Sequence, residues 1–429
     1  MSDVLIPDGW TQVKLGDVCV LNPSVPLKRG SHYNYVDMAS IDVALRYSPI
    51  LRNREFGGGG SRFQQGDTLM ARITPCLENG KIAQVHSDPE APYGFGSTEF
   101  IVLRSILGIT DSNYIYYLVK GPDLRNHAVS NMSGTSGRQR VPTEAMRILD
   151  ILLPPLHEQK AIAHILGSLD DKIDQLRKTN SVLEEMASAL FKSWFVDFDP
   201  VKAKQENIPT GLPPELDALF PDSFEDSSLG PIPKGWRVVG LASTGEFLNG
   251  LALQKYPGDV LPVIKIPQLR QNSSEGADRC SNGVAPQYVI DDGDLLFSWS
   301  GTLVAGWWTA GKGALNQHLF KVSSGELSTV MLKHWIDHHL PWFKLVASSK
   351  AVTMGHIKRG HLDEAKVVIP EPTFKDYADS ILADYRDKYI TNGKQIRTLT
   401  NLRDTLLPTL ISGELRVPEA EEMVADLGL

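Results

Sequence analysis

The sequence predicts an α+β protein built as an internal tandem duplication, in which two α/β domains are separated by two long antiparallel, coiled-coil-like helices. Short peptides of the first half return in the same order in the second half. In addition, two long stretches carry apolar residues at helical spacing, and each follows a region rich in strand and turn signals. We expect four parts: a first domain at 1–153, a long helix and linker at 154–229, a second domain at 230–370, and a second helix with an acidic tail at 371–429.

Both predicted domains consist of short apolar runs broken by clusters of Gly, Pro, Asn and Asp. Examples are FGGGGSRFQQGD, which begins at Phe56, and LRQNSSEGADRCSNG, which begins at Leu269. Such clusters are typical of turns between short strands. We therefore expect each domain to combine strands with long loops.

The first long helix is predicted over residues 158–196. Apolar residues recur there every seven positions, and two more stand three positions after members of this series: Ile162, Leu169, Leu176, Leu183 and Leu190, with Ile165 and Met186. Gly167 is the one glycine in the stretch, which holds no proline. We expect Pro154 and Pro155 to mark the start of the helix and Pro200 to mark its end, because proline interrupts helical hydrogen bonding.

The second long helix is predicted from Asp376 to Leu407 and should end before Pro408. One face carries Ile381, Tyr385, Tyr389, Ile396, Leu399, Leu402 and Leu406. An isolated helix with an apolar stripe is marginal in water, so we expect the two helices to pair along these seams. The alternative, in which each helix packs only on its own domain, is disfavoured by the repeat.

The repeat itself is visible at two offsets. At the longer offset, IPDGW at Ile6 returns as IPKGW at Ile232, and GDTLMAR at Gly66 returns as GDLLFSW at Gly293. Further along the chain a shorter offset applies, at which Pro154 matches Pro370, Ile165 matches Ile381, Asp171 matches Asp387 and Leu190 matches Leu406. Several matches in one order indicate duplication of the whole domain-plus-helix unit.

Composition narrows the class of protein. Hydrophobic residues make up 42% and charged residues 22%, and no run approaches the roughly 18 apolar residues that cross a membrane. The three cysteines lack metal-ligand spacing and the first residues lack a secretory signal, so a reducing cytoplasm is expected.

The net charge of −8 arises mainly outside the two predicted domains. The difference between basic and acidic residues is zero for 1–150, −7 for 151–229, +3 for 230–370 and −4 for 371–429. The domains therefore remain compatible with a nucleic-acid partner.

None of the candidate catalytic motifs in the sequence is complete. GWWTAGKG has Gly306, Gly311 and Lys312 at P-loop spacing, but Gly313 stands where the motif has Ser or Thr. We interpret the segment as a glycine-rich hairpin. The sequence also lacks the Asn/Asp-Pro-Pro-aromatic tetrapeptide of adenine methyltransferases. Three histidines, His334, His338 and His339, lack a carboxylate pattern such as H-E-x-x-H and are expected on a solvated helix surface.

The helical regions resemble a known family. ILLPPLHEQKAIAHILGSLDDKIDQLRKTN, followed by LEEMASALFKSWFVDFDPV, resembles the central conserved region of the DNA-specificity (S) subunit of type I restriction-modification systems. LRDTLLPTLISGEL, residues 402–415, resembles the C-terminal conserved region. Five shorter segments resemble parts of the target-recognition domains of this family: LENGK, GSTEFIVL, GTSGRQRV, LNQHLFKV and MGHIKRGHL.

This resemblance implies a non-catalytic subunit with two target-recognition domains, each of which reads half of a bipartite site in double-stranded DNA, and two helices that act as the spacer. It implies two modification (methyltransferase) subunits as partners, which bind S-adenosylmethionine. In the restricting form it also implies restriction/translocase subunits, which use ATP and Mg. No cofactor is expected in this chain.

Candidate DNA-binding residues are planar or forked donors in glycine-bearing loops. GTSGRQRV supplies Arg138, Gln139 and Arg140, which can pair with guanine or adenine edges, and the equivalent segment of the second domain supplies His356, Lys358 and Arg359. Further candidates, for each of which a turn or a buried hydrogen bond is the alternative role, are Arg72, Asn79 and Lys81 in the first domain and Lys265, Gln268, Arg270, Ser300 and Gln317 in the second.

Three aromatic residues, Trp194, Phe195 and Phe198, gather at the end of the first long helix. They form either part of a core or a docking surface for a modification subunit, and the resemblance favours docking. Two other classes of protein remain to be distinguished from the specificity subunit. A self-contained methyltransferase or nuclease would act without partners, and a coiled-coil scaffold would bind protein only.

Overall fold

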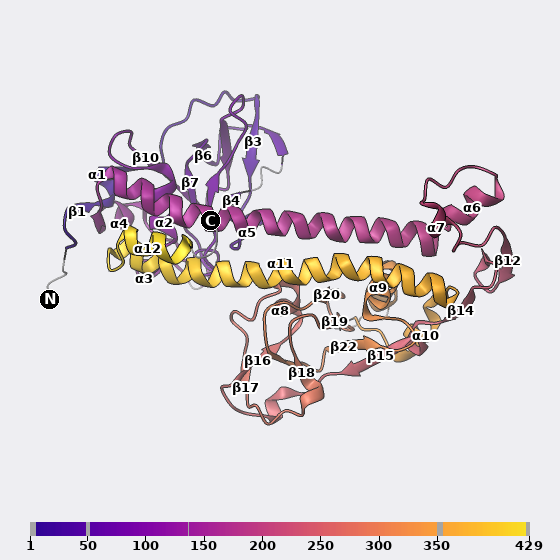
Figure 1. Cartoon of the computed structure of the whole chain (residues 1–429). Coiled ribbons are helices and arrows are strands. Elements are labelled where there is room, and N and C mark those ends of the chain that lie inside the picture. Colours follow the sequence, from indigo (N-terminus) through magenta and orange to yellow (C-terminus); the bar gives the residue numbers. More distant parts are fainter. Residues whose placement is uncertain (1–5, 49–51, 136, 350–354, 426–429) are drawn as a thin grey trace. The chain divides into compact units, whose positions relative to one another are not determined.

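The computed structural model describes residues 6–48, 52–135, 137–349 and 355–425. The chain divides into two compact units (Figure 1). Unit 1 comprises Met1–Gln175 with Thr398–Leu429, and unit 2 comprises Leu176–Arg397. Each unit therefore contains one α/β domain and parts of both long helices. Within the described residues, no helix is both long and apolar enough to cross a membrane.

The domain of unit 1 contains two main sheets. The first has the strand order β2-β10-β7-β8-β4, and the second has the order β5-β3-β9-β6 with a parallel β3·β9 pair. The strands of the first sheet are β2 (Cys19–Leu21), β10 (Phe100–Ser105), β7 (Thr68–Ala71), β8 (Ile82–Val85) and β4 (Tyr47–Ser48). The other strands are β5 (Arg52–Glu55), β3 (His32–Val36), β9 (Tyr93–Gly96) and β6 (Ser61–Gln64), with β1 (Thr11–Lys14) paired to β11 (Asp150–Leu153). The short helices are α1 (Leu15–Val18), α2 (Ser112–Lys120), α3 (Pro122–Ser130) and α4 (Thr143–Arg147).

The domain of unit 2 repeats this topology, except that its first sheet has four described strands instead of five. Its first sheet has the order β15-β22-β19-β20, and its second has the order β17-β16-β21-β18 with a parallel β16·β21 pair. The strands are β15 (Gly245–Asn249), β22 (Leu319–Ser324), β19 (Leu295–Ser298), β20 (Ala305–Trp307), β17 (Arg279–Cys280), β16 (Leu261–Ile264), β21 (Gly313–Leu315), β18 (Val289–Ile290), β14 (Arg237–Gly240), β23 (Lys366–Ile369), β12 (Phe224–Ser227) and β13 (Gly230–Pro233). The helices are α6 (Asp199–Gln205), α7 (Pro214–Asp217), α8 (Ile266–Gln271), α9 (Thr329–Ser349) and α10 (Arg359–Glu364), and short 3-10 turns cover Leu241–Ser243, Leu253–Lys255 and Pro286–Tyr288.

Strand registers confirm the duplication residue by residue. Thr11 pairs with Leu153 in unit 1, and Arg237 pairs with Ile369 in unit 2. Thr11 and Arg237 are related by the longer offset found in the sequence, and Leu153 and Ile369 are related by the shorter one. A slip of one residue would turn every side chain to the other face of its strand, so an identical register keeps the same positions buried in both domains.

The two long helices are confirmed, with different ends. The first, α5, spans Leu156–Phe191 and continues as the π-helix η1 (Lys192–Val196), and the second, α11, spans Pro372–Ser412 before α12 (Val417–Ala425). The expected end before Pro408 is wrong, because α11 continues through this proline. Leu407 and Leu410, on either side of it, are buried, and their packing offsets the roughly 3 kcal/mol that an internal proline costs.

The paired seam contains polar residues as well as the predicted apolar ones. In unit 1, Arg403 Nη1 donates to Asp170 Oδ1 at 2.7 Å, and both residues are buried. In unit 2, Asn392 Nδ2 donates to Asn180 Oδ1 at 2.8 Å. Ile162, Leu169 and Leu176 are buried as expected. Met186 is not part of the seam, because its side chain is 49% exposed.

Each domain is attached to the helices of its own unit. In unit 1, Gln159 of α5 is fully buried and its amide donates to the carbonyls of Ile109 and Pro154. In unit 2, Lys333 of α9 forms ion pairs with Asp337 and, at 3.6 Å, with Glu184 of α5. The domains are therefore fixed to the helices by buried polar contacts in addition to apolar packing.

Candidate nucleic-acid interface

Two of the predicted segments of the first domain meet beside the end of β7. Arg72 follows this strand directly, and its carbonyl accepts a hydrogen bond from the N–H of Val141 at 2.9 Å. The N–H of Thr74 donates to the carbonyl of Gln139 at 3.0 Å, and Ile73 forms a β-bridge with Arg140. The structure therefore brings Arg72 and the GTSGRQRV loop together, as the sequence alone could not show.

Arg140 is held by an acidic residue that sequence reasoning missed. Its guanidinium contacts both carboxylate oxygens of Glu99, with Nη2–Oε1 at 2.7 Å and Nε–Oε2 at 2.9 Å. Hydrogen bonds from Arg140 lower the pKa of the Glu99 carboxyl, and the positive charge of Arg72 adds to this effect. The Arg140 side chain is 44% exposed, so part of its donor set faces outward while the rest is committed to Glu99.

Arg138 differs from Arg140 because its side chain is exposed and makes no hydrogen bond or ion pair with the described residues. Gly134 and Gly137, which precede it in the loop, have positive φ angles of 129° and 77°, a conformation that glycine adopts without strain. Ser136, between them, lies outside the described residues. The side chain of Arg138 is therefore exposed on a loop whose backbone conformation requires glycine at positions 134 and 137.

The LENGK segment separates into two roles. Asn79 is exposed next to the turn at Gly80, whereas Lys81 Nζ donates to the carbonyl of Met38 at 2.6 Å. The ammonium group of Lys81 thereby contacts the 37–41 loop. Asn79 keeps an outward-facing side chain.

The second domain builds the same frame with different side chains. The N–H of Trp299 donates to the carbonyl of His318 at 3.3 Å, just as the N–H of Arg72 donates to the carbonyl of Glu99 at 2.9 Å. Ile357 N–H donates to the Trp299 carbonyl, as Val141 does to Arg72, and Ser300 forms a β-bridge with His356. We call Arg72, Glu99 and Arg140 the first triplet, and the matching Trp299, His318 and His356 the second triplet.

Around the second triplet the contacts are among polar and aromatic groups. Ser300 Oγ lies 2.9 Å from His318 Nδ1, and the Gln317 amide nitrogen lies 3.3 Å from His318 Nε2. The Trp299 indole N–H donates to the carbonyl of Gln317 at 3.1 Å, and its ring lies 6.3 Å from the His356 ring. The candidates Ser300, Gln317 and His356 are therefore brought together, whereas sequence reasoning missed Trp299 and His318.

The remaining candidates of the second domain are placed less favourably. Gln268 is buried and its side-chain oxygen accepts from the N–H of Lys265, while Lys265 itself pairs with Asp278. Arg359 Nη2 donates to the carbonyl of Phe247 at 3.0 Å. Each of these three side chains has a partner within the domain. Because Gln268 is also buried, the structure replaces the expected DNA contact of this residue with a structural role. Arg270 and Lys358 are exposed. Met354 of the MGHIKRGHL segment lies outside the described residues.

The docking expectation for two aromatic residues needs correction. Trp194 and Phe195 are 3% and 0% exposed, and both rings pack against Phe374 at 5.7 and 5.6 Å. They belong to the core of unit 2, because the π-helical turn directs them toward α11. Phe198 is half-buried and packs on Trp236 at 5.9 Å.

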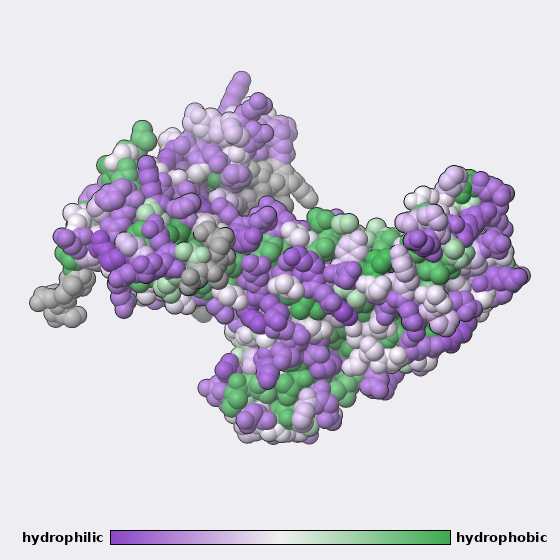
Figure 2. Space-filling model, in the orientation of Figure 1, coloured by the Kyte–Doolittle hydropathy of each residue, from purple (hydrophilic) through white to green (hydrophobic). Residues whose placement is uncertain are grey.

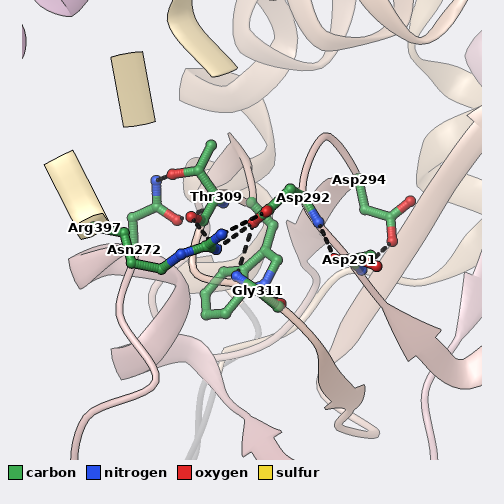
Figure 3. A network of polar contacts seen from close by, with 8 residues as sticks. Asn272, Asp291, Asp292, Asp294, Thr309, Gly311 and Arg397 are labelled. Atoms are coloured by element: carbon green, nitrogen blue, oxygen red, sulfur yellow. Dashed lines mark hydrogen bonds and ion pairs between the residues drawn. The ribbon is translucent and has the colours of Figure 1, made fainter. Parts of the chain in front are cut away.

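The segment that resembles a P-loop contacts the long helix α11. Gly311 N–H donates to Asp292 Oδ1 at 2.8 Å, and Arg397 of α11 binds both oxygens of Asp292 at 2.6 and 2.8 Å (Figure 3). Arg397 also donates to the carbonyl of Thr309. The expected hairpin is wrong, because β20 pairs with β19 whereas β21 pairs with β16 and β18.

The three histidines of α9 lie in different surroundings. The structure holds no cluster of three His, Cys, Asp or Glu side chains suited to a metal among its described residues. His334 is buried, stacks on Phe191 at 5.1 Å, and has a pKa lowered by burial to about 3. The expectation of a solvated surface is therefore wrong for His334, whereas His338 is exposed.

Comparison with known proteins gives consistent matches. Residues 7–185 match the family model described as the type I restriction modification DNA specificity domain. The chain is 28% identical to the type I restriction enzyme MjaIX specificity subunit of Methanocaldococcus jannaschii over 72% of this chain and 70% of that protein. It is 24% identical to the HindI specificity subunit of Haemophilus influenzae over 95% of this chain and 99% of that protein. The S subunit from M. genitalium has the same fold, with a TM-score of 0.53 at 14% identity over 96% and 98% of the two chains.

Proposed function

Because the chain belongs to the family of type I restriction-modification DNA-specificity subunits, we propose that each of its two domains reads one half of a bipartite DNA site through its own triplet and the neighbouring loop. The observation that carries this proposal is the pair of triplets. Equivalent backbone hydrogen bonds hold Arg72 and Glu99 in one domain and Trp299 and His318 in the other. One frame with two sets of side chains is what two different half-sites require.

The chemistry of the triplets supports base reading in different ways. Arginine donors fit guanine O6 and N7, and a carboxylate accepts from cytosine N4. The first triplet offers both types of group, and exposed Arg138 lies two residues from Arg140. The second triplet offers imidazole and indole groups, beside the amide of Gln317, which suits adenine N6 and N7. The two half-sites should therefore differ in sequence.

The long helices set the number of base pairs between the half-sites in this proposal. The 36 residues of α5 correspond to about 54 Å at 1.5 Å per residue, whereas one turn of B-DNA is about 34 Å. Helices of this length suffice to separate two domains by at least one turn. The buried polar pairs of the seam support a fixed helix register.

The catalytic activities in this proposal belong to partner subunits. We propose that this non-catalytic chain assembles with two modification subunits that use S-adenosylmethionine, and in the restricting form with restriction subunits that use ATP and Mg. The complex would act in the cytoplasm, where it meets DNA. Because the chain carries a net charge of −8, much of the phosphate contact should come from those partners.

A domain exchange tests the proposed function. Residues 1–153 are replaced by the equivalent domain of a relative, the complete complex is expressed, and its methylated sites are sequenced. One half of the methylated motif should change while the other half and the gap stay the same. A change in both halves would contradict independent reading by the two domains. The matched exchange of residues 230–370 should alter the other half only.

Two further assays separate the alternative classes. The purified chain, incubated with labelled S-adenosylmethionine and DNA, should transfer no methyl group, whereas a self-contained methyltransferase would. A gel shift with and without modification subunits should show specific DNA binding in the assembled complex. A scaffold that binds protein only would also assemble with modification subunits, but the resulting complex would bind DNA without sequence preference.

A further inference from the structure

Three polar side chains of the second domain form a chain of hydrogen bonds that we call the amide relay: Ser300, His318 and Gln317. Ser300 Oγ lies 2.9 Å from His318 Nδ1, and the amide nitrogen of Gln317 lies 3.3 Å from His318 Nε2. Ser300 is buried, whereas His318 and Gln317 are half-buried. The relay therefore leads from a buried hydroxyl to an amide that is partly accessible.

The donors and acceptors of the relay follow from its chemistry. An amide nitrogen only donates, so Nε2 of His318 accepts a hydrogen bond from Gln317. A neutral imidazole has one N–H and one acceptor nitrogen, so the ring proton is on Nδ1 and is donated to Ser300 Oγ. His318 thus holds one N–H of the Gln317 amide and leaves the other N–H and Oε1 for a ligand.

The backbone that carries this amide is fixed by hydrogen bonds on several sides. The indole N–H of Trp299 donates to the carbonyl of Gln317 at 3.1 Å, and the N–H of Gln317 donates to the carbonyl of Leu251 at 2.9 Å. The N–H of His318 donates to Oδ1 of Asn316 at 3.2 Å. Because the main chain is held in this way, the orientation of the side-chain amide is the variable that the relay sets.

The first domain has different side chains at the equivalent positions. In the order Ser300, Gln317 and His318, the repeat places Ile73, Thr98 and Glu99 there. Isoleucine forms no side-chain hydrogen bond and threonine has no amide, so the relay belongs to the second domain. The surfaces of the domains differ as well: Figure 2 shows hydrophobic surface over the sheet that contains β16 and β18, whereas the visible face of the first domain is mostly hydrophilic.

We propose that Gln317 reads an adenine in the half-site of the second domain, and that His318 and Ser300 are positioning residues that fix the orientation of its amide. The inference rests on the proposed function, in which this domain reads one half-site. The available N–H and Oε1 of Gln317 match N7 and the N6 amino group of adenine in the major groove. Guanine presents two acceptors there, O6 and N7, so Oε1 would face an acceptor. Adenine is therefore preferred while His318 accepts from the amide.

The relay makes this preference depend on the protonation of His318. When both ring nitrogens carry a proton, Nε2–H faces the amide nitrogen of Gln317, and a half turn of the amide brings Oε1 to that proton instead. The N–H groups of Gln317 then face outward and match the two acceptors of guanine. Because imidazole groups change charge between about pH 5 and 8, the ratio of adenine to guanine affinity should fall as the pH is lowered through this range.

Other charged groups lie on the segments around the relay. In the described residues, the segment bridged to Ser300 and the two neighbouring strands carry His356, Lys358, Arg359, Lys321 and Asp294. Lys321 and Asp294 pair with each other at 2.7 Å, and Arg359 donates to a backbone carbonyl. His356 is the other imidazole of this set, so a variant at this position serves to assign the pH dependence.

Competition binding of the assembled complex tests the preference in the wild-type chain. Each A·T pair of the second half-site is changed in turn to G·C, and the ratio of the two affinities is measured from about pH 5 to about pH 8. At one position the ratio should favour adenine about tenfold at the upper end and fall several-fold toward the lower end. The same exchange in the first half-site is the control. Its ratios should not change with pH in this way, because the first triplet contains no imidazole.

Matched variants assign the effect to the relay. Gln317→Glu removes the amide donors and should abolish the adenine preference at that position, a loss of about tenfold. His318→Gln supplies an acceptor that does not titrate and should keep the preference at every pH, whereas His318→Leu removes the acceptor and should give a low ratio at every pH. His356→Gln removes another candidate contact and should lower the overall affinity, yet the ratio should still depend on pH.

The outcomes separate this inference from the proposed function. The inference is overturned if the second half-site contains no adenine, or if none of its adenine-to-guanine ratios responds to pH and to Gln317→Glu. Specific binding to a bipartite site would then still support the proposed function. If the wild-type complex binds all sequences equally, the proposed function fails instead. Undiminished discrimination in the first half-site shows that each variant is folded.

Discussion

Asn392 donates its side-chain amide to Asn180 across the helix pair of unit 2, and the two residues are only 1% and 7% exposed. Asn180 in turn donates to the carbonyl of Tyr389 at 3.2 Å. An apolar seam with a repeating pattern can pair in more than one register, whereas a buried amide pair is satisfied in only one of them. We therefore expect the asparagines to select the register at some expense of stability.

Replacing both asparagines tests this role. The double substitution Asn180→Leu with Asn392→Leu should leave the melting temperature unchanged or raise it, because it removes two desolvated amides together. The methylated sites of the assembled complex should then show more than one gap length. Asn392→Leu alone should cost about 1–3 kcal/mol, because it leaves the oxygen of Asn180 buried and unpaired. A single gap length in the double variant would show that the domains alone hold the register.

The ion pair of unit 1 gives a second prediction. Burial alone would raise the pKa of Asp170, but the charges of Lys120 and Arg403 and the hydrogen bonds from Arg403 and Tyr117 outweigh it, so the pKa is lowered. Arg403→Met should therefore destabilise the chain by about 3–5 kcal/mol, since the carboxylate stays buried without its partner. Denaturant unfolding measures the loss. Asp170→Leu combined with Arg403→Leu should recover most of it.

The lowered pKa of Asp170 also predicts a pH dependence. The unfolded carboxyl titrates near 3.9, above its folded pKa, so this contribution to stability is present above about pH 4 and is lost as the pH falls below it. The urea midpoint of wild type should therefore fall more steeply than that of the double leucine variant as the pH is lowered through this range. A constant difference would contradict the assigned shift.

His334 predicts acid sensitivity at higher pH. Burial and the nearby charge of Lys333 lower its pKa from 6.5 to about 3. Between these values the unfolded chain binds a proton that the folded chain excludes, so this contribution is full above about pH 6.5 and declines as the pH falls toward 3. His334→Phe, which retains stacking on Phe191, should flatten the decline of the unfolding midpoint over this range. His338→Phe, at an exposed position, should flatten it less.

The arginines of the first domain should respond differently to truncation. Arg138→Ala should cost about 1–3 kcal/mol in DNA binding and relax specificity at one base pair if this side chain reads a base. Arg140→Ala should cost more, because it releases the carboxylate of Glu99 toward the DNA. Adding Glu99→Gln should recover part of that loss. Filter binding of the assembled complex to cognate and single-base variant duplexes measures each effect, and Arg147→Ala is the control.

The spacer can be altered directly. Insertion of four residues near Lys178, which is exposed on α5, adds about 6 Å of rise, close to two base-pair steps. It also turns the helix by roughly 40° beyond a full turn, part of which local unwinding can absorb. Sequencing of methylated DNA should show unchanged half-sites with a gap longer by one or two base pairs. An unchanged gap at full activity would mean that other elements fix the spacing.

The sequence predicted the parts of this fold that depend on periodicity and repetition. The heptad spacing of Ile162, Leu169 and Leu176 marked the buried seam correctly, and the two repeat offsets agree with the observed strand registers. Such features are local or self-similar, so one chain without relatives suffices to find them.

Long-range side-chain contacts were not predictable in this way. Glu99 and His318 each precede a strand by one residue, and only the repeat alignment of TEFIVL with QHLFKV could have marked them as equivalent. For Trp194 the resemblance favoured docking over a place in the core, and the sequence does not reveal which aromatic side chains the helix end directs inward. Pro408 stopped the predicted helix because local propensity cannot include the burial of Leu407 and Leu410.

The division into units bears on how the chain is made. Unit 2 is one continuous segment, whereas unit 1 begins with the first residues and is completed only by Thr398–Leu429. Asp170 emerges from the ribosome 233 residues ahead of Arg403, an interval of about 10–50 s at bacterial and eukaryotic rates of synthesis. Arg397, the last residue of unit 2, is made only six residues ahead of Arg403, so unit 2 is complete before unit 1, and until then the first domain waits with the seam face of α5 uncovered. The domain that is synthesised first thus belongs to the unit that is finished last, and premature termination between residues 397 and 429 would leave unit 1 incomplete while sparing unit 2.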